Sequence, residues 1–248
     1  MIEDKLSDSG QHINTTTLDL RHDGITVGDT GEIGLWLYGA LRHQEVELNL
    51  EERSGFGFGI WHQHAPIPNS TNTLSLVYRE GAAIPQGKIN PQPVREAQGY
   101  DLNQANRWEV NNDFLYEPAS PFALHWSLIY RHDESGVEGN TGDELVWLST
   151  GIRPIYYFDD HLNLAFEYGF DWVENERTTL DGSLHKGTLA LQMAISRGYF
   201  ARPVLRLFAT YAKWSDDFRG LVGTRPGDMA YANDTSGWSL GIQMEAWW

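Results

Sequence analysis

Apolar and polar residues alternate with a period of two along much of this chain, and this alternation constrains the fold more than any other feature. It is clearest near the C-terminus, where Trp238, Leu240 and Ile242 are separated by Ser239 and Gly241. Successive side chains of a β-strand point to opposite faces, whereas a helix repeats every 3.6 residues. The pattern therefore predicts strands with two different faces, and helical periodicity is hard to find anywhere.

About eleven strands are predicted in this way, and no linker, repeat or low-complexity run separates them. We therefore predict an all-β, antiparallel fold in which residues 1–248 form one domain. Two of the segments, 31–41 and 144–155, are apolar on both faces, so their sides stay unassigned. The predicted strands are 14–23, 31–41, 54–64, 72–80, 105–116, 122–131, 144–155, 162–172, 185–195, 202–213 and 237–248.

The connections between the predicted strands alternate in length. A soluble sandwich has no reason to lengthen every second loop, whereas an outer-membrane β-barrel has short turns at one end and long external loops at the other. From the C-terminus backward, the long connections are 214–235, 173–184, 133–143 and 81–104, and the short ones are 196–201, 156–161 and 117–121.

Aromatic residues gather toward the ends of the predicted strands, with Leu, Ile and Val between them. Aromatic girdles bracket a lipid-facing apolar band in this way. The alternative is a soluble or secreted β-sandwich, whose inward face is equally apolar. Loop lengths and aromatic positions together favour the transmembrane β-barrel. The aromatic residues are Trp172, Tyr130, Trp126, Tyr116, Trp238 and Trp248.

Composition excludes several classes of function. The formal charge of -16 argues against nucleic acid as a partner, because phosphate binding needs clustered Lys and Arg. The absence of Cys removes thiol catalysis and Cys-ligated zinc. His62 and His64 share one side of a predicted strand, but no third metal ligand accompanies them. No nucleophile motif is present, so we expect neither an enzyme nor a metal or other cofactor.

The N-terminal residues 1–6 have no basic region followed by an apolar one, so they do not resemble a signal peptide. An all-antiparallel barrel closes with an even number of strands, and about eleven are predicted here. Both observations indicate a single β-barrel domain that is truncated at its N-terminus. We expect its tilted strands to form either an open, strongly curved sheet or a smaller closed barrel.

Three stretches of the chain are long, ordered and specific enough to point to a known family: 236–248, 201–214, and 151–156 followed by 171–175. Together they resemble the maltoporin family of outer-membrane sugar channels. The similarity is strong over 144–248 and weaker over 14–143. It implies about eleven strands of an 18-stranded barrel in the bacterial outer membrane, which assembles as a homotrimer and passes maltose and maltodextrins by facilitated diffusion.

In that family the sugar slides along a track of aromatic rings, and the resemblance assigns two track positions here. Trp247 occupies the penultimate Trp position and, by strand parity, faces away from lipid. Phe200 stands where the family usually has a track Trp. A third family aromatic falls near Thr71, which cannot stack on a sugar, and Trp61 on the neighbouring glycine-rich strand is a hypothetical substitute.

Charged residues on the inward faces offer hydrogen bonds to sugar hydroxyls, although charges in a watery lumen often only pair with one another. Arg202 and Arg206 are the stronger sugar-binding candidates, because they lie beside Phe200 on one face. The other inward charges are Arg107, Glu109, Arg131, Glu167, Asp171 and Glu245.

The sequence therefore predicts a carbohydrate-selective porin that needs no cofactor and has lipid and linear saccharides as partners. Two alternatives stay open at this point. One is the carbohydrate-binding β-sandwich, and the other is a truncated porin remnant that does not transport.

Overall fold

The computed structural model describes residues 2–6, 11–29, 31–43, 52–84, 105–134, 136, 144–176, 179–222 and 230–246. Within these ranges, twelve strands form one sheet, and every strand pairs antiparallel with its neighbours in the sequence. The strands are β1 (Ile2–Leu6), β2 (Gln11–Val27), β3 (Gly31–Arg42), β4 (Arg53–His64), β5 (Ser70–Glu80), β6 (Asn106–Tyr116), β7 (Phe122–Glu134), β8 (Glu144–Tyr157), β9 (Leu162–Asn175), β10 (Leu180–Ala194), β11 (Val204–Trp214) and β12 (Ser236–Glu245).

Two short 3-10 helices, η2 (Gly81–Ala83) and η5 (Asp216–Phe218), lie between strands. No helix in the described part of the chain is long and apolar enough to cross a membrane. The prediction of an all-β antiparallel fold is confirmed. The eleven predicted strands correspond to β2–β12, and the structure adds β1, which pairs with β2 and was not predicted.

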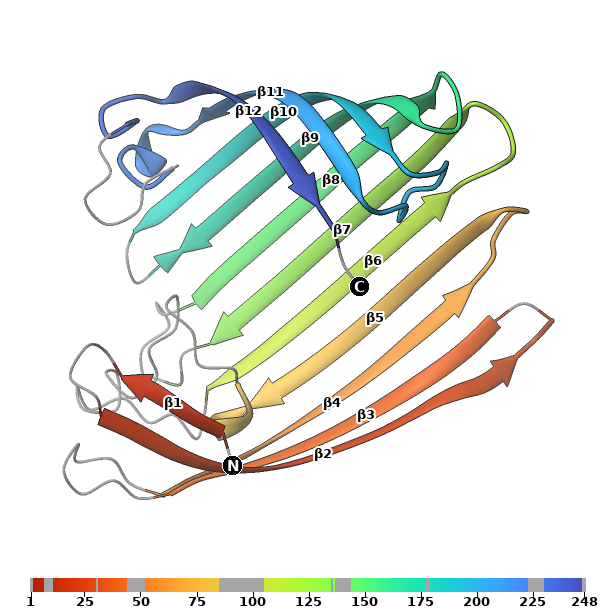
Figure 1. The fold of residues 1–248 in the computed structure, drawn as a ribbon. Coiled ribbons are helices and arrows are strands. Elements are labelled where there is room, and N and C mark those ends of the chain that lie inside the picture. The colour runs from red at the N-terminus through yellow and green to blue at the C-terminus, as the bar shows by residue number, and fades with distance from the viewer. Residues whose placement is uncertain are drawn as a thin grey trace.

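The sheet curls strongly, so that β11 and β12 arch over the middle strands (Figure 1). Among the described strands, β1 and β12 each pair with one neighbour only, which makes them the two edges. Of the two expected shapes, the structure therefore has the open, strongly curved sheet. A β-sandwich needs two packed sheets, and the single sheet found here contradicts that alternative.

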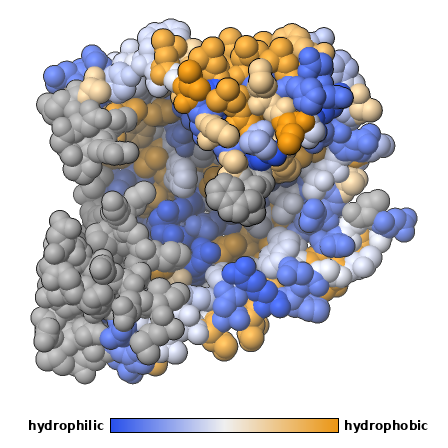
Figure 2. Space-filling model, in the orientation of Figure 1, coloured by the Kyte–Doolittle hydropathy of each residue, from blue (hydrophilic) through white to orange (hydrophobic). Residues whose placement is uncertain are grey.

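The convex, outward face of the sheet is apolar. On β12, Leu240 is 79% exposed and its neighbours Trp238 and Ile242 on the same face are also exposed. Figure 2 shows hydrophobic residues over the top of the molecule, where β11 and β12 run, and hydrophilic residues in the hollow beneath. Large exposed apolar surfaces are unusual in soluble monomers, so this face is suited to lipid.

Strand pairing assigns the sides of the two segments that were apolar on both faces. On β3, Leu35 and Leu37 are exposed on the outward face, whereas Trp36 faces inward opposite Gly59 of β4. On β8, Ile152 is exposed on the outward face, which places its neighbours in sequence on the inward one.

The connections at one end of the sheet are longer than those at the other, except that 176–179 at the long end is short and 195–203 at the short end is as long as 135–143. The predicted long connection 173–184 is wrong, because β9 continues through Asn175 and β10 already begins at Leu180. These two strands extend past the predicted ends while keeping their antiparallel register. The connections at one end are 28–30, 65–69, 117–121, 158–161 and 195–203, and those at the other are 43–52, 81–105, 135–143, 176–179 and 215–235.

Candidate functional site

Phe200 lies in the turn 195–203, at the end of the sheet where the connections are short. The residue is 64% exposed, and its ring meets the ring of Tyr199 edge-on with 4.9 Å between centroids. Gly198 precedes them with a φ of 144°, a conformation that glycine adopts without the steric cost of a side chain. The turn therefore presents one aromatic ring to solvent and holds its neighbour against the protein.

The same turn is tied to the turn 117–121, about eighty residues earlier in the chain. The backbone N–H of Tyr199 donates to Glu117 Oε1 at 2.7 Å, and the Tyr157 hydroxyl donates to the same oxygen at 3.0 Å. Arg197 donates to the carbonyls of Pro118, Ala119 and Ser120. The turn carrying Phe200 is consequently fixed by charge-assisted hydrogen bonds, which are stronger than neutral ones.

Tyr199 also packs on the inward face of the sheet. Its side chain lies against a small buried cluster formed by Ala123, Ile155, Tyr157 and Ala165. Burial raises the pKa of the Tyr199 hydroxyl, and the nearby Arg153 guanidinium opposes that rise. Tyr199 thus stays a neutral phenol at ordinary pH, and its packing brings the turn 195–203 over the inward face.

Arg202 and Arg206 are brought together by a shared carboxylate. Arg202 Nε lies 3.0 Å and Arg206 Nη1 lies 2.5 Å from Glu245 of β12. Arg206 Nε also donates to Gln192 at 2.9 Å, and Arg202 Nη1 donates to the Tyr199 carbonyl at 3.2 Å. Both guanidinium groups are mostly buried and paired with Glu245, so they fix the local geometry.

Trp61 lies on the inward face of β4 and covers Gly34 of β3. A Cβ atom at Gly34 would stand 2.0 Å from the Trp61 ring, so only glycine leaves room for it. Trp36 and Tyr38 of β3 stack with 5.4 Å between centroids, and the Arg79 guanidinium lies 5.1 Å from the Trp36 ring. The structure thus adds Trp36 and Tyr38 to the inward aromatics, which alternation missed because segment 31–41 is apolar on both faces.

The two remaining positions of the predicted aromatic track are Trp247 and Thr71. Trp247 lies outside the described residues, as does Trp248. Thr71 lies in β5 and is exposed, and strand parity places it on the inward face with Ser75, Val77 and Arg79.

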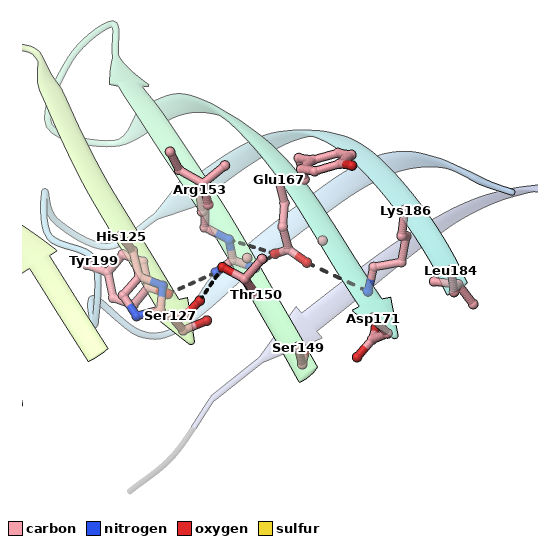
Figure 3. Close-up of a pocket in the computed structure, with 14 residues that line it drawn as sticks. His125, Ser127, Ser149, Thr150, Arg153, Glu167, Asp171, Leu184, Lys186 and Tyr199 are labelled. Carbon is pink, nitrogen blue, oxygen red and sulfur yellow. Dashed lines mark hydrogen bonds and ion pairs between the residues drawn. The ribbon is translucent and has the colours of Figure 1, made fainter. Parts of the chain in front are cut away.

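A hollow of about 280 Å³ lies on the inward wall between β7 and β10 (Figure 3). Arg153 Nε donates to Glu167 at 2.9 Å, and Lys186 Nζ lies 3.7 Å from the same carboxylate. Asp171 accepts a hydrogen bond from Trp147 at 3.0 Å. Tyr199 closes the opposite side of the hollow, with its ring 4.9 Å from that of His125.

A second hollow of about 190 Å³ adjoins the first, because Arg153 and Glu167 line both. It extends to Arg206, Gln192 and the inward-facing ring of Phe208. Alternation predicts that Glu167, Asp171 and Arg206 face inward, but it cannot predict either hollow, since both depend on which strands are neighbours.

His62 and His64 are the two histidines for which no third metal ligand was predicted. Their rings stack with 4.7 Å between centroids. In the described part of the chain, the one cluster with ligand geometry is His132, Glu134 and Glu144, whose ligand atoms lie within 4.8 Å of one another. Both carboxylates are exposed at the surface, and exposed acidic groups commonly stand together without an ion. We assign no metal site to it.

A curved antiparallel sheet with an apolar outward face and a polar, charged inward face defines a protein of the porin class. A family model described as LamB porin matches residues 2–248. The chain belongs to the LamB porin family, so its sheet is part of a β-barrel fold of the bacterial outer membrane. Members of this family are channels without enzymatic activity, and the resemblance to maltoporins is confirmed.

Proposed function

We propose that this protein passes maltose and linear maltodextrins through the outer membrane by facilitated diffusion. The observation that supports this best is the exposed ring of Phe200, in a turn fixed at the inward face and next in sequence to the Arg202–Glu245–Arg206 cluster. The flat apolar face of a glucosyl unit stacks on such a ring, while ionised groups beside it hydrogen-bond the hydroxyls.

Trp61 extends this proposal to β4, which lies on the same inward face as Phe200 but in the N-terminal half of the sheet. It lies near the end of β4 that leads into the short turn 65–69, and Phe200 also lies at the short-turn end. Trp247, by its position in the family, is the third proposed stacking residue. Several weak aromatic sites let a sugar chain enter and still leave, which is what conduction requires.

We also propose that the protein works as a homotrimer, as its family suggests. The apolar outward face offers surface both for lipid and for contact between subunits. Mass measurement of the detergent-extracted protein with and without heating tests this. A trimer mass that falls to a monomer mass on heating supports it, and a monomer mass in both samples contradicts it.

Conductance in a planar bilayer, with maltohexaose added as a blocker, tests the proposed function. We expect steady channels that maltohexaose blocks. Phe200→Leu should weaken this block about two- to twelvefold, because ring stacking contributes roughly 0.5–1.5 kcal/mol. The matched control is Phe166→Leu on the outward face, which should leave the block unchanged.

Channels that maltohexaose does not block would contradict the proposed sugar specificity, and the protein would then be a general porin. Equal weakening in Phe200→Leu and Phe166→Leu would show that the change acts through folding rather than through a sugar contact.

A further inference from the structure

We propose that the hollow between β7 and β10 is a binding site of its own for one neutral pyranose unit. This inference rests on the proposed function, since it names an additional saccharide site in the same lumen. It differs from the proposed stacking positions Phe200 and Trp61, because neither of these two residues lines the hollow.

The size of the hollow sets the size of its ligand. Pockets for drug-sized molecules have volumes of roughly 300–1,000 Å³. At about 280 Å³ the hollow is just below that range, and one sugar ring suits it better than an oligosaccharide. The remaining units of a sugar chain would have to lie outside it.

The charges around the hollow favour a neutral ligand. Two cations, Arg153 and Lys186, face two carboxylates, Glu167 and Asp171, within the same lining. A charged ligand gains no net attraction from a balanced set. A sugar hydroxyl, which both donates and accepts, can bond to a carboxylate and a cation at once.

The spacing of these charges leaves a place for a hydroxyl. Arg153 Nε and Glu167 are 2.9 Å apart, an ordinary hydrogen bond. Lys186 Nζ and Glu167 are 3.7 Å apart, which is beyond the 2.7–3.2 Å range of good N–H···O bonds. A hydroxyl that accepts from Lys186 and donates to Glu167 would improve on the direct contact. Figure 3 shows both groups on the wall of the hollow.

The hollow is also connected to the other proposed contacts. Tyr199 lines it and touches the ring of Phe200 with 4.9 Å between centroids. On the other side, Arg153 and Glu167 are shared with the second hollow, which reaches Arg206. A sugar chain with one unit in the hollow can therefore have its next units beside Phe200 or Arg206.

One glycine at the hollow allows a selective test. A Cβ atom added at Gly169 would meet no heavy atom within 4 Å, so a larger side chain there would project into the open space. Gly187 of β10 provides the matched control, because it faces outward and an added Cβ would only touch Phe166 at 4.0 Å. Gly169→Leu fills the site without removing any charged group, whereas Gly187→Leu adds the same side chain to the lipid-facing surface.

The experiment is equilibrium binding of maltotriose to the whole chain in detergent micelles, measured by calorimetry. We expect Gly169→Leu to bind about fivefold or more weakly than the wild type, and Gly187→Leu to bind like the wild type. Glu167→Gln, which keeps the shape but removes the charge, should also weaken binding. Circular dichroism shows whether Gly169→Leu folds. If it does not fold, the Glu167→Gln variant still tests the inference.

The outcomes separate this inference from the proposed function. Wild-type affinity in folded Gly169→Leu and in Glu167→Gln, together with weakened binding in Phe200→Leu, would overturn the site while the proposed function stands. A wild-type chain that binds no maltotriose would contradict both. Equal losses in Gly169→Leu and Gly187→Leu would overturn the site as well, because a lipid-facing change cannot block it.

Discussion

The inward wall of β3–β5 and the inward wall formed by β8 and β9 use glycine in opposite ways. On the first wall, aromatic rings occupy the space that glycines leave: Trp61 covers Gly34, and a Cβ at Gly59 would stand 3.2 Å from the Trp36 ring. On the second wall, Gly169 has nothing within 4 Å of an added Cβ, and Gly151 has only ordinary contacts.

The charges follow the same division. On the first wall, Arg79 lies over the Trp36 ring and also donates to Glu109 of β6 at 2.9 Å. On the second wall, Glu167 bonds Arg153 and keeps a longer contact with Lys186. The first wall is therefore a filled aromatic surface on which a ligand can only stack, and the second is a hollow that a ligand can enter.

The largest effect is expected from Gly55→Ala at the edge of the filled wall. An added Cβ would stand 2.4 Å from the backbone nitrogens of Ala82 and Ala83 and from the carbonyl of Glu80. Backbone atoms of a short 3-10 helix cannot move aside easily. We expect a loss of about 3 kcal/mol in the free energy of unfolding, the upper end for overpacking. Urea titration in detergent micelles measures it, and a loss below about 1 kcal/mol would show that the wall is not filled there.

A smaller effect is expected from Gly34→Ala. Here the added Cβ meets the Trp61 ring, which can rotate away, so we expect a loss of about 1–2 kcal/mol. The rotation should also shift the tryptophan fluorescence, because the ring leaves its covered position against the strand. Unchanged stability together with an unchanged spectrum would mean that Trp61 does not lie on Gly34.

The smallest effect is expected from Gly169→Ala in the hollow. The new methyl group meets open space, and alanine restricts the unfolded chain more than glycine does. The free energy of unfolding should therefore change by less than about 0.5 kcal/mol or rise slightly. A loss as large as that of Gly55→Ala would remove the difference between the two walls.

Alternation was enough to predict the strands β2–β12 and the sides of most of them, because a strand with one lipid face must repeat every two residues. It failed for β3, where Trp36 and Leu37 are both apolar but face opposite ways. Once both faces are apolar, only pairing with a neighbour such as Gly59 decides the side. β9 and β10 could not be followed past their predicted ends for a different reason: the added residues, 173–175 and 180–184, are largely polar, so they show little alternation.

The candidate site was predictable only in part. Phe200, Arg202 and Arg206 could be named from sequence because they stand close together in the chain. The contact of Tyr199 with Glu117 could not, because the two residues are far apart in sequence and meet only through the curvature of the sheet. The hollow needs side chains from four neighbouring strands and from the turn 195–203, so no local pattern in the sequence encodes it.

The most direct test of the two faces uses single cysteines, since the chain contains none of its own. Gly169→Cys and Gly187→Cys place a thiol on the inward and the outward face of adjacent strands. The rate of modification by a charged, membrane-impermeant thiol reagent is then measured for the protein in lipid vesicles. The face assignment predicts rapid modification at position 169, slowed by maltohexaose, and little modification at position 187. Equal rates at the two positions, or faster modification at 187, would contradict it.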